Sequence, residues 1–153
     1  MVAPVHDKGG ILIGYVANRA HHADIGGASP GSMPLATELL QEGLIIPPVK
    51  LLVAGKTNEG VFDVICRNSR TPDERRGDLT AQIACIGVGS ARLVEIVDDY
   101  GLGVVQDHMA ELLRYAETLT RAAIESITDG EYHFEDVLDG DGLSDKPICI
   151  AVT

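Results

Sequence analysis

Apolar residues recur every three or four positions through the second half of the chain. This spacing places them on one face of an α-helix, and that face needs other apolar surface to cover it. The helix is expected to stop at Asp129 and Gly130. The residues of the stripe are Val105, Met109, Leu112, Ala116, Leu119, Ala123 and Ile127.

A second long helix is expected directly before it. Thr71 and Pro72 form a helix start, and a glutamate three residues after the threonine would complete a capping box. Gly101 marks the expected end of this helix. Gly87 and Gly89 lie inside it and are expected to break or thin it.

Short strands are expected at both ends of the chain. Residues 11–17 form a continuous apolar run after a Lys-Gly-Gly turn, and residues 2–5 read as the other arm of a hairpin. Residues 132–137 and 148–152 resemble two strands around an acidic loop, and residues 61–65 fit a short helix. The predicted fold class is therefore α+β, with short strands at both ends flanking a central group of three or so helices.

Composition restricts the class of protein. The chain has 153 residues, 45% of them apolar, and is expected to be a single domain. Its net charge of −11 argues against a nucleic-acid or anionic-membrane partner. It has neither a signal peptide nor an apolar run of about 18 residues, so a cytoplasmic location is expected. Cys66, Cys85 and Cys149 lack a CxxC spacing, which favours reduced thiols, and Cys66 and Cys85 are expected to be buried.

The strongest chemical signal is the pair His21 and His22 with Asp24, followed by a glycine-rich loop. Imidazole nitrogen and carboxylate oxygen are ligands of Zn, Mn or Fe. In an extended segment His22 and Asp24 share a face, whereas His21 and Asp24 suit a turn. Two ligands are too few for a tight site, so others must come from elsewhere. The alternative is that both imidazoles form local hydrogen bonds and Asp24 begins a turn.

Three ordered motifs in this chain resemble the hydantoinase B/oxoprolinase family. The first is residues 14–27, which contain Asn-Arg-Ala-His-His-Ala-Asp-Ile-Gly-Gly, followed by residues 30–34, Pro-Gly-Ser-Met-Pro. The second is residues 42–51, Glu-Gly-Leu-Ile-Ile-Pro-Pro-Val-Lys-Leu, and the third is residues 67–82, which begin Arg-Asn-Ser-Arg-Thr-Pro-Asp-Glu. Proteins of that family are several times longer, so the resemblance implies that residues 1–153 are an internal fragment of a hydantoinase B-type subunit.

The resemblance implies an ATP-dependent hydrolase that opens a cyclic amide, either a hydantoin or 5-oxoproline. A hydantoinase A-type partner subunit would bind ATP and phosphorylate the substrate, and the B-type subunit would complete the reaction. In the intact protein, a divalent metal (Zn, Mn or Fe) would be held by ligands from His21, His22 and Asp24, together with an upstream block that this chain lacks. The isolated chain is therefore expected to be inactive, and its catalytic and substrate-binding residues stay unassigned.

Two alternative functions remain open. One is a subunit of a ligase similar to acetone or acetophenone carboxylase, which belongs to the same family. The other is a non-catalytic interaction module, or a split subunit, that docks on a larger partner. Strand-like sequence at both ends would leave sheet edges exposed, so self-association is expected.

Overall fold

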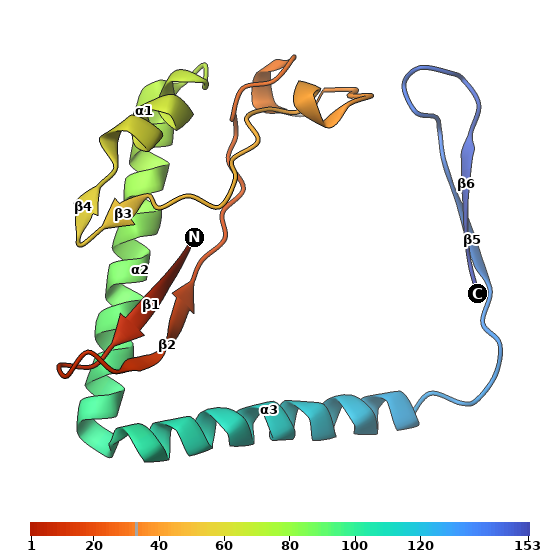
Figure 1. The fold of residues 1–153 in the computed structure, drawn as a ribbon. Helices are drawn as coiled ribbons and strands as arrows, with labels where there is room; N and C mark the ends of the chain where they lie inside the picture. The colour runs from red at the N-terminus through yellow and green to blue at the C-terminus, as the bar shows by residue number, and fades with distance from the viewer. Residues whose placement is uncertain (33) are drawn as a thin grey trace. The chain divides into compact units, whose positions relative to one another are not determined.

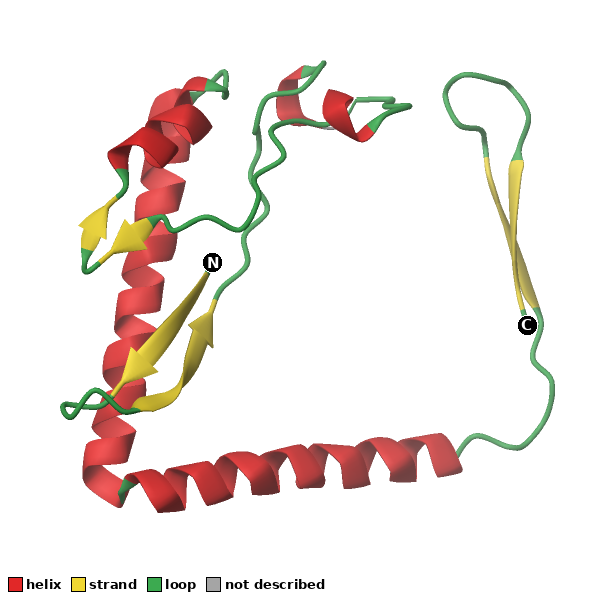
Figure 2. Cartoon of the chain, viewed as in Figure 1, coloured by secondary structure: helices red, strands yellow, loops and turns green. Residues whose placement is uncertain are grey.

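The computed structural model describes residues 1–32 and 34–153 (Figure 1). Met33, in the first of the three motifs, lies outside the described residues. The chain divides into two compact units, residues 1–5 with 14–91 and residues 6–13 with 92–153. In the described residues, one short and two long α-helices occur between strand pairs near the two ends of the sequence (Figure 2). The predicted α+β class is confirmed.

The N-terminal hairpin is present as predicted. Strands β1 (Val2–His6) and β2 (Leu12–Ala17) pair in a two-stranded sheet. The Asp7 carboxylate closes the turn, because its Oδ1 accepts hydrogen bonds from the backbone N–H of Gly9 at 2.8 Å and of Ile11 at 2.7 Å. A local side-chain hydrogen bond of this kind fixes the turn, which explains why the pattern was readable from sequence.

A small apolar core lies where α1 meets α2. Strands β3 (Leu52–Val53) and β4 (Lys56–Thr57) form a short antiparallel pair that leads into α1 (Glu59–Arg67). The core consists of Phe62, Ile65 and Cys66 of α1 with Leu79 of α2. Burial raises the pKa of the Cys66 thiol, because the surrounding apolar groups disfavour the thiolate. Cys66 is buried as predicted, whereas the same prediction for Cys85 is wrong, since that thiol is exposed.

Helix α2 (Pro72–Tyr100) is continuous, so the predicted break at Gly87 and Gly89 is wrong. A glycine costs a helix only about 1 kcal/mol, which neighbouring turns and packing overcome. At Gly89 an added Cβ would lie 3.4 Å from the Val16 side chain, so the glycine allows close packing against β2. The helix starts and ends where predicted, although Thr71 Oγ1 is buried without a hydrogen-bond partner in the described residues, so the predicted capping box does not form.

Helix α2 also contains a long apolar stretch. By length and composition alone it would suffice to cross a membrane, with a mean hydropathy of 1.3 over its best 18-residue window, of which 6% is buried. A helix that packs against other parts of a protein can have the same length and hydropathy, so these values alone do not indicate a membrane span. The predicted absence of a membrane partner stays a prediction.

The second unit contains α3 (Leu102–Glu125) and the hairpin of β5 (Phe134–Leu138) and β6 (Ile148–Val152), near their predicted positions. Helix α3 ends before the predicted stop at Asp129 and Gly130, so Ile127 of the predicted stripe lies outside it. The two strands pair antiparallel, with Phe134 opposite Val152. Every residue of both strands is exposed, and Val105 is the buried residue of α3. Leu112 and Leu119 of the predicted stripe are 66% and 53% exposed. The stripe therefore forms, but the described residues leave most of it uncovered.

Two glycines allow the loop after β2 to approach its neighbours closely. This loop runs into two short 3-10 turns, at Pro30–Ser32 and Leu39–Gln41. Gly26 and Gly27 have φ values of +90° and +91°, a region that side chains disfavour. An added Cβ would lie 2.6 Å from the Asn68 carbonyl oxygen at Gly26 and 2.5 Å from the Gln41 carbonyl oxygen at Gly27. The loop thus depends on glycine for both its backbone angles and its packing.

We expect Gly27→Ala to lower the free energy of unfolding more than Gly55→Ala does. Both glycines have a positive φ, which costs an alanine about 1–2 kcal/mol. Gly55 has open space around it, whereas the clash at Gly27 adds about 1–3 kcal/mol. Urea unfolding of the two variants measures the difference. Equal losses of unfolding free energy in the two variants would show that the loop rearranges around the added methyl group without an energetic cost.

Candidate functional site

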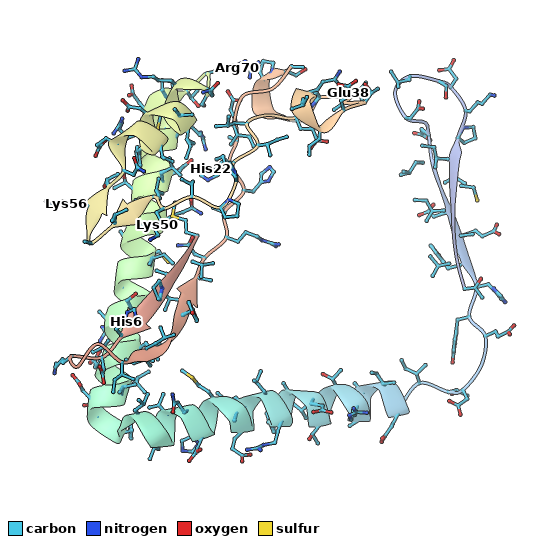
Figure 3. The ribbon with its side chains drawn as sticks, viewed as in Figure 1. His6, His22, Glu38, Lys50, Lys56 and Arg70 are labelled. Atoms are coloured by element: carbon cyan, nitrogen blue, oxygen red, sulfur yellow. The ribbon has the colours of Figure 1, made fainter. Side chains whose placement is uncertain are left out.

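A pocket of about 330 Å³ opens between α2 and the segment that follows β2. We call it the histidine pocket. Figure 3 shows His22 on that segment, beside α2. The pocket lining combines backbone-anchoring, ionisable and small side chains from the two elements. They are Asn18, Arg19, Ala20, His21, His22, Asp78, Ala81, Gln82 and Cys85.

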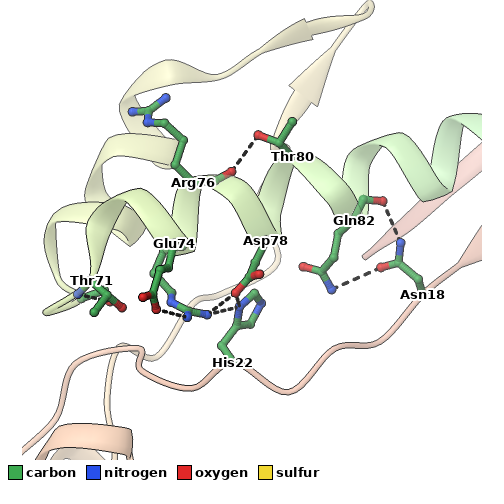
Figure 4. A network of polar contacts seen from close by, with 10 residues as sticks. Asn18, His22, Thr71, Glu74, Arg76, Asp78, Thr80 and Gln82 are labelled. Atoms are coloured by element: carbon green, nitrogen blue, oxygen red, sulfur yellow. Dashed lines mark hydrogen bonds and ion pairs between the residues drawn. The ribbon is translucent and has the colours of Figure 1, made fainter.

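Asn18 and Gln82 hold one end of the segment on the helix (Figure 4). The Asn18 amide Nδ2 donates to the Gln82 backbone oxygen at 2.8 Å, and the Gln82 amide Nε2 donates to Asn18 Oδ1 at 3.4 Å. The carbonyl oxygen of Gln82 thus accepts a side-chain hydrogen bond from outside the helix. This pair fixes the position at which the chain leaves β2.

Arg75 holds the middle of the segment from within α2. Its side chain is only 3% exposed. Nη1 lies 2.8 Å from His22 Nδ1 and 2.6 Å from Asp78 Oδ2, and Nη2 lies 3.7 Å from a Glu74 carboxylate oxygen. Figure 4 shows the His22 ring next to Asp78. A buried guanidinium needs acceptors, and this one has an imidazole and one carboxylate within hydrogen-bond distance and a second carboxylate as an ion-pair partner.

Asp24 holds the far end of the segment at the start of α2. It is 4% exposed. Its Oδ1 accepts from the Gly26 N–H at 2.8 Å and from Arg70 Nη1 at 3.2 Å, and its Oδ2 accepts from the Arg70 N–H at 2.8 Å. Arg70 Nη2 also donates to the Gly27 carbonyl oxygen at 2.9 Å. Asp24 therefore begins a turn, which is what the alternative to metal binding predicted for this residue. Its carboxylate also anchors the loop.

The structure brings two of the three predicted metal ligands to one pocket. His21 and His22 both line the histidine pocket, whereas Asp24 is not among its lining residues. Within residues 1–32 and 34–153, no three His, Cys, Asp or Glu side chains are placed to hold a metal ion together. Metal binding by His21, His22 and Asp24 stays a prediction.

Sequence reasoning missed the residues that α2 contributes. Arg75, Asp78, Gln82 and Cys85 follow one another at intervals of three, four and three residues. That spacing places polar side chains on one helix face. A surface helix commonly has such a face, so the spacing alone does not indicate a site. The signal was present, but only the partner segment at residues 18–22 shows that this face lines a pocket.

Comparison with known proteins assigns these residues to a family. Residues 1–153 match the family model described as hydantoinase B/oxoprolinase. The chain is 41% identical over 138 residues to the B-type component of a D-/L-hydantoinase from Pseudomonas sp. (strain NS671), covering 89% of this chain and 23% of the relative. It is 37% identical over 155 residues to the beta subunit of caprolactamase from Pseudomonas jessenii, covering 99% of this chain and 26% of the relative.

A solved structure agrees with these relatives. The crystal structure of the ATP-dependent caprolactamase from Pseudomonas jessenii matches with a TM-score of 0.71 and 32% identity, covering 90% of this chain and 23% of the other. A 5-oxoprolinase from Dictyostelium discoideum is 36% identical over 129 residues, covering 84% of this chain and 10% of the relative. The chain thus spans about a quarter or less of the proteins that it matches.

We expect Asp24→Ala to destabilise the protein by about 2–3 kcal/mol, because it leaves two part-buried backbone N–H groups without their charged acceptor. Asp98→Ala is the matched control. Asp98 pairs with Lys8 on the surface at 2.7 Å, and removing such an exposed, solvent-screened pair costs little stability. Thermal unfolding of both variants measures the difference. A loss at Asp24 no larger than that at Asp98 would contradict an anchoring role.

Proposed function

Since the chain belongs to the hydantoinase B/oxoprolinase family, we propose that it is part of the B-type subunit of an ATP-dependent cyclic amide hydrolase. The observation that carries the proposal is the histidine pocket, where two imidazoles of the family-like first motif face the polar side of α2. The similar proteins support the reaction class, since they are a hydantoinase, a caprolactamase and a 5-oxoprolinase. The intact protein would contain this segment among others.

The reaction needs an activated carbonyl. Amide resonance makes a lactam or hydantoin ring resistant to attack by water, so ATP-dependent phosphorylation by an A-type partner subunit would supply the activation. The similar caprolactamase is ATP-dependent, which supports ATP use. On this chain, N–H groups of the histidine pocket would orient the ring, since Asn18, Arg19 and His22 of the first motif line the pocket and carry side-chain nitrogen donors.

His21 is the best candidate for a metal ligand in this segment. Its side chain is exposed at the pocket, and no hydrogen bond or ion pair engages it in the described part of the chain. Asp24 differs, because loop and arginine N–H groups already occupy both of its oxygens. When bound, a divalent metal would polarise the substrate carbonyl or activate water. Its remaining ligands would come from other parts of the intact protein.

An interaction module is the second candidate function. Most of the apolar stripe of α3 and both strands of the C-terminal hairpin are exposed in the described residues, and such surfaces commonly mark contacts with other protein. A module of this kind would bind the A-type partner without contributing to turnover. The proposed location is the cytoplasm, where a soluble partner and ATP are both available.

The intact B-type subunit, mixed with an A-type subunit and ATP, should open a cyclic amide ring. The assay offers hydantoin, 5-oxoproline and caprolactam in parallel and measures ADP and the ring-opened acid. The 153-residue chain in place of the intact protein is the control and should be inactive. If the B-type subunit binds the A-type subunit but no ring is opened, the result would favour the interaction module. Carboxylation of a ketone with bicarbonate would favour the ligase alternative.

The variant His21→Ala should remove most of the divalent metal that the intact protein binds. Metal content per protein is measured by mass spectrometry after extensive dialysis. His6→Ala is the matched control, since His6 is an exposed histidine of β1 outside the histidine pocket. Unchanged metal content in His21→Ala would contradict this ligand assignment.

A further inference from the structure

The contact between Arg75 and His22 determines which nitrogen of the imidazole carries the proton. A guanidinium has only donor N–H groups, so it cannot accept a hydrogen bond from a ring N–H. At 2.8 Å from Arg75 Nη1, His22 Nδ1 must therefore be the acceptor. In the neutral imidazole the remaining proton then lies on Nε2.

We infer that Arg75 fixes His22 as a neutral Nε2–H donor that is presented to the histidine pocket for an oxygen acceptor of the bound ligand. This acceptor is the carbonyl oxygen of a cyclic amide, an identification that rests on the proposed function. Arg75 and Asp78 are then positioning residues, because they act on the ligand only through His22. No hydrogen bond engages Nε2 of His22 in the part of the chain that the structure describes, and His22 lines the pocket.

The hydrogen bonds of Arg75 support this assignment. Nη1 carries two N–H groups, and it has two acceptors, His22 Nδ1 at 2.8 Å and Asp78 Oδ2 at 2.6 Å. Asp78 follows Arg75 by three residues on the same helix, so the backbone fixes the direction of that second bond. The side chain of Arg75 is 3% exposed and that of His22 17%, which leaves water little access to replace the contact.

The other neutral tautomer does not suit this arrangement, because the neighbouring carboxylate oxygen, Asp78 Oδ2, lies 3.6 Å from His22 Nδ1, beyond hydrogen-bond distance. It would aim a ring N–H at the guanidinium and leave a buried arginine donor without an acceptor, at a cost of about 1–3 kcal/mol. The fixed tautomer also separates the roles of the two histidines. With its Nδ1 bound to Arg75 and its Nε2 protonated, His22 has no lone pair left for a metal ion, whereas His21 keeps its own.

The test is nitrogen NMR of the full 153-residue chain labelled with ¹⁵N-histidine, recorded at about pH 8.5, where a histidine of ordinary pKa is neutral. Wild-type His22 should be entirely the Nε2–H form, whereas exposed His6 should show the averaged mixture of a free imidazole. Arg75→Met should bring His22 to that same mixture. Arg75→Lys, which keeps a donor, should retain more of the Nε2–H form. Circular dichroism checks that each variant keeps its helix content.

An Nδ1–H signal from His22 in the wild-type chain would overturn the inference, whatever the variants do. So would a His22 tautomer that Arg75→Met leaves unchanged while the helices persist. Hydantoin is the ligand probe, and it should shift the Nε2 resonance of His22 but not that of His6; no shift at saturating hydantoin would overturn the donor role. The tautomer measurement needs no turnover, so an inactive reconstituted complex would contradict the proposed function alone.

Discussion

The buried guanidinium of Arg75 is the interaction on which the histidine pocket depends. A charge in this position is costly unless every N–H finds an acceptor, and a buried pair that loses one partner costs about 3–5 kcal/mol. The acceptors here are the His22 ring and the Asp78 carboxylate. The need of this guanidinium for acceptors has two effects: it holds the 18–24 segment on α2, and it fixes the orientation of the His22 imidazole. In the described residues Arg75 Nε is buried without a partner, so the guanidinium is not fully satisfied by this segment alone.

Three polar contacts at intervals along α2 position the segment. Asn18 pairs with Gln82, His22 with Arg75, and Asp24 with Arg70 just before the helix begins. As the segment advances from residue 18 to 24, its partners step backward from 82 to 70, so the two run antiparallel. An extended chain rises about 3.3 Å per residue, whereas a helix rises about 1.5 Å per residue. The six residue steps from 18 to 24 therefore cover nearly the same length as the twelve steps from 70 to 82, most of which lie in α2.

Local patterns predicted most of the fold, and tertiary contacts decided the rest. The hairpin at Asp7, both ends of α2 and the start of α3 depend on turn and helix signals within a few residues, so the sequence alone located them. Helix α3 ends at Glu125, before the predicted stop at Asp129 and Gly130. The predicted break at Gly89 failed because Val16 packs there. For the site, the residue types of the first motif pointed to His21 and His22. Arg75 and Asp78 were missed because a polar helix face gains meaning only from the segment that lies on it.

The three motifs that resemble the family are the parts of this chain that contact one another. The first and third meet through Arg70 and Arg75, and Gly26 of the first lies against the Asn68 carbonyl of the third. The second joins them, since the Leu44 N–H donates to the Ile25 carbonyl oxygen at 3.0 Å. Side chains at such contacts cannot change independently, because each substitution leaves a buried donor, acceptor or backbone approach unmatched. The mutual packing of these segments is thus a structural reason for their joint appearance as family motifs, independent of the chemistry at the pocket.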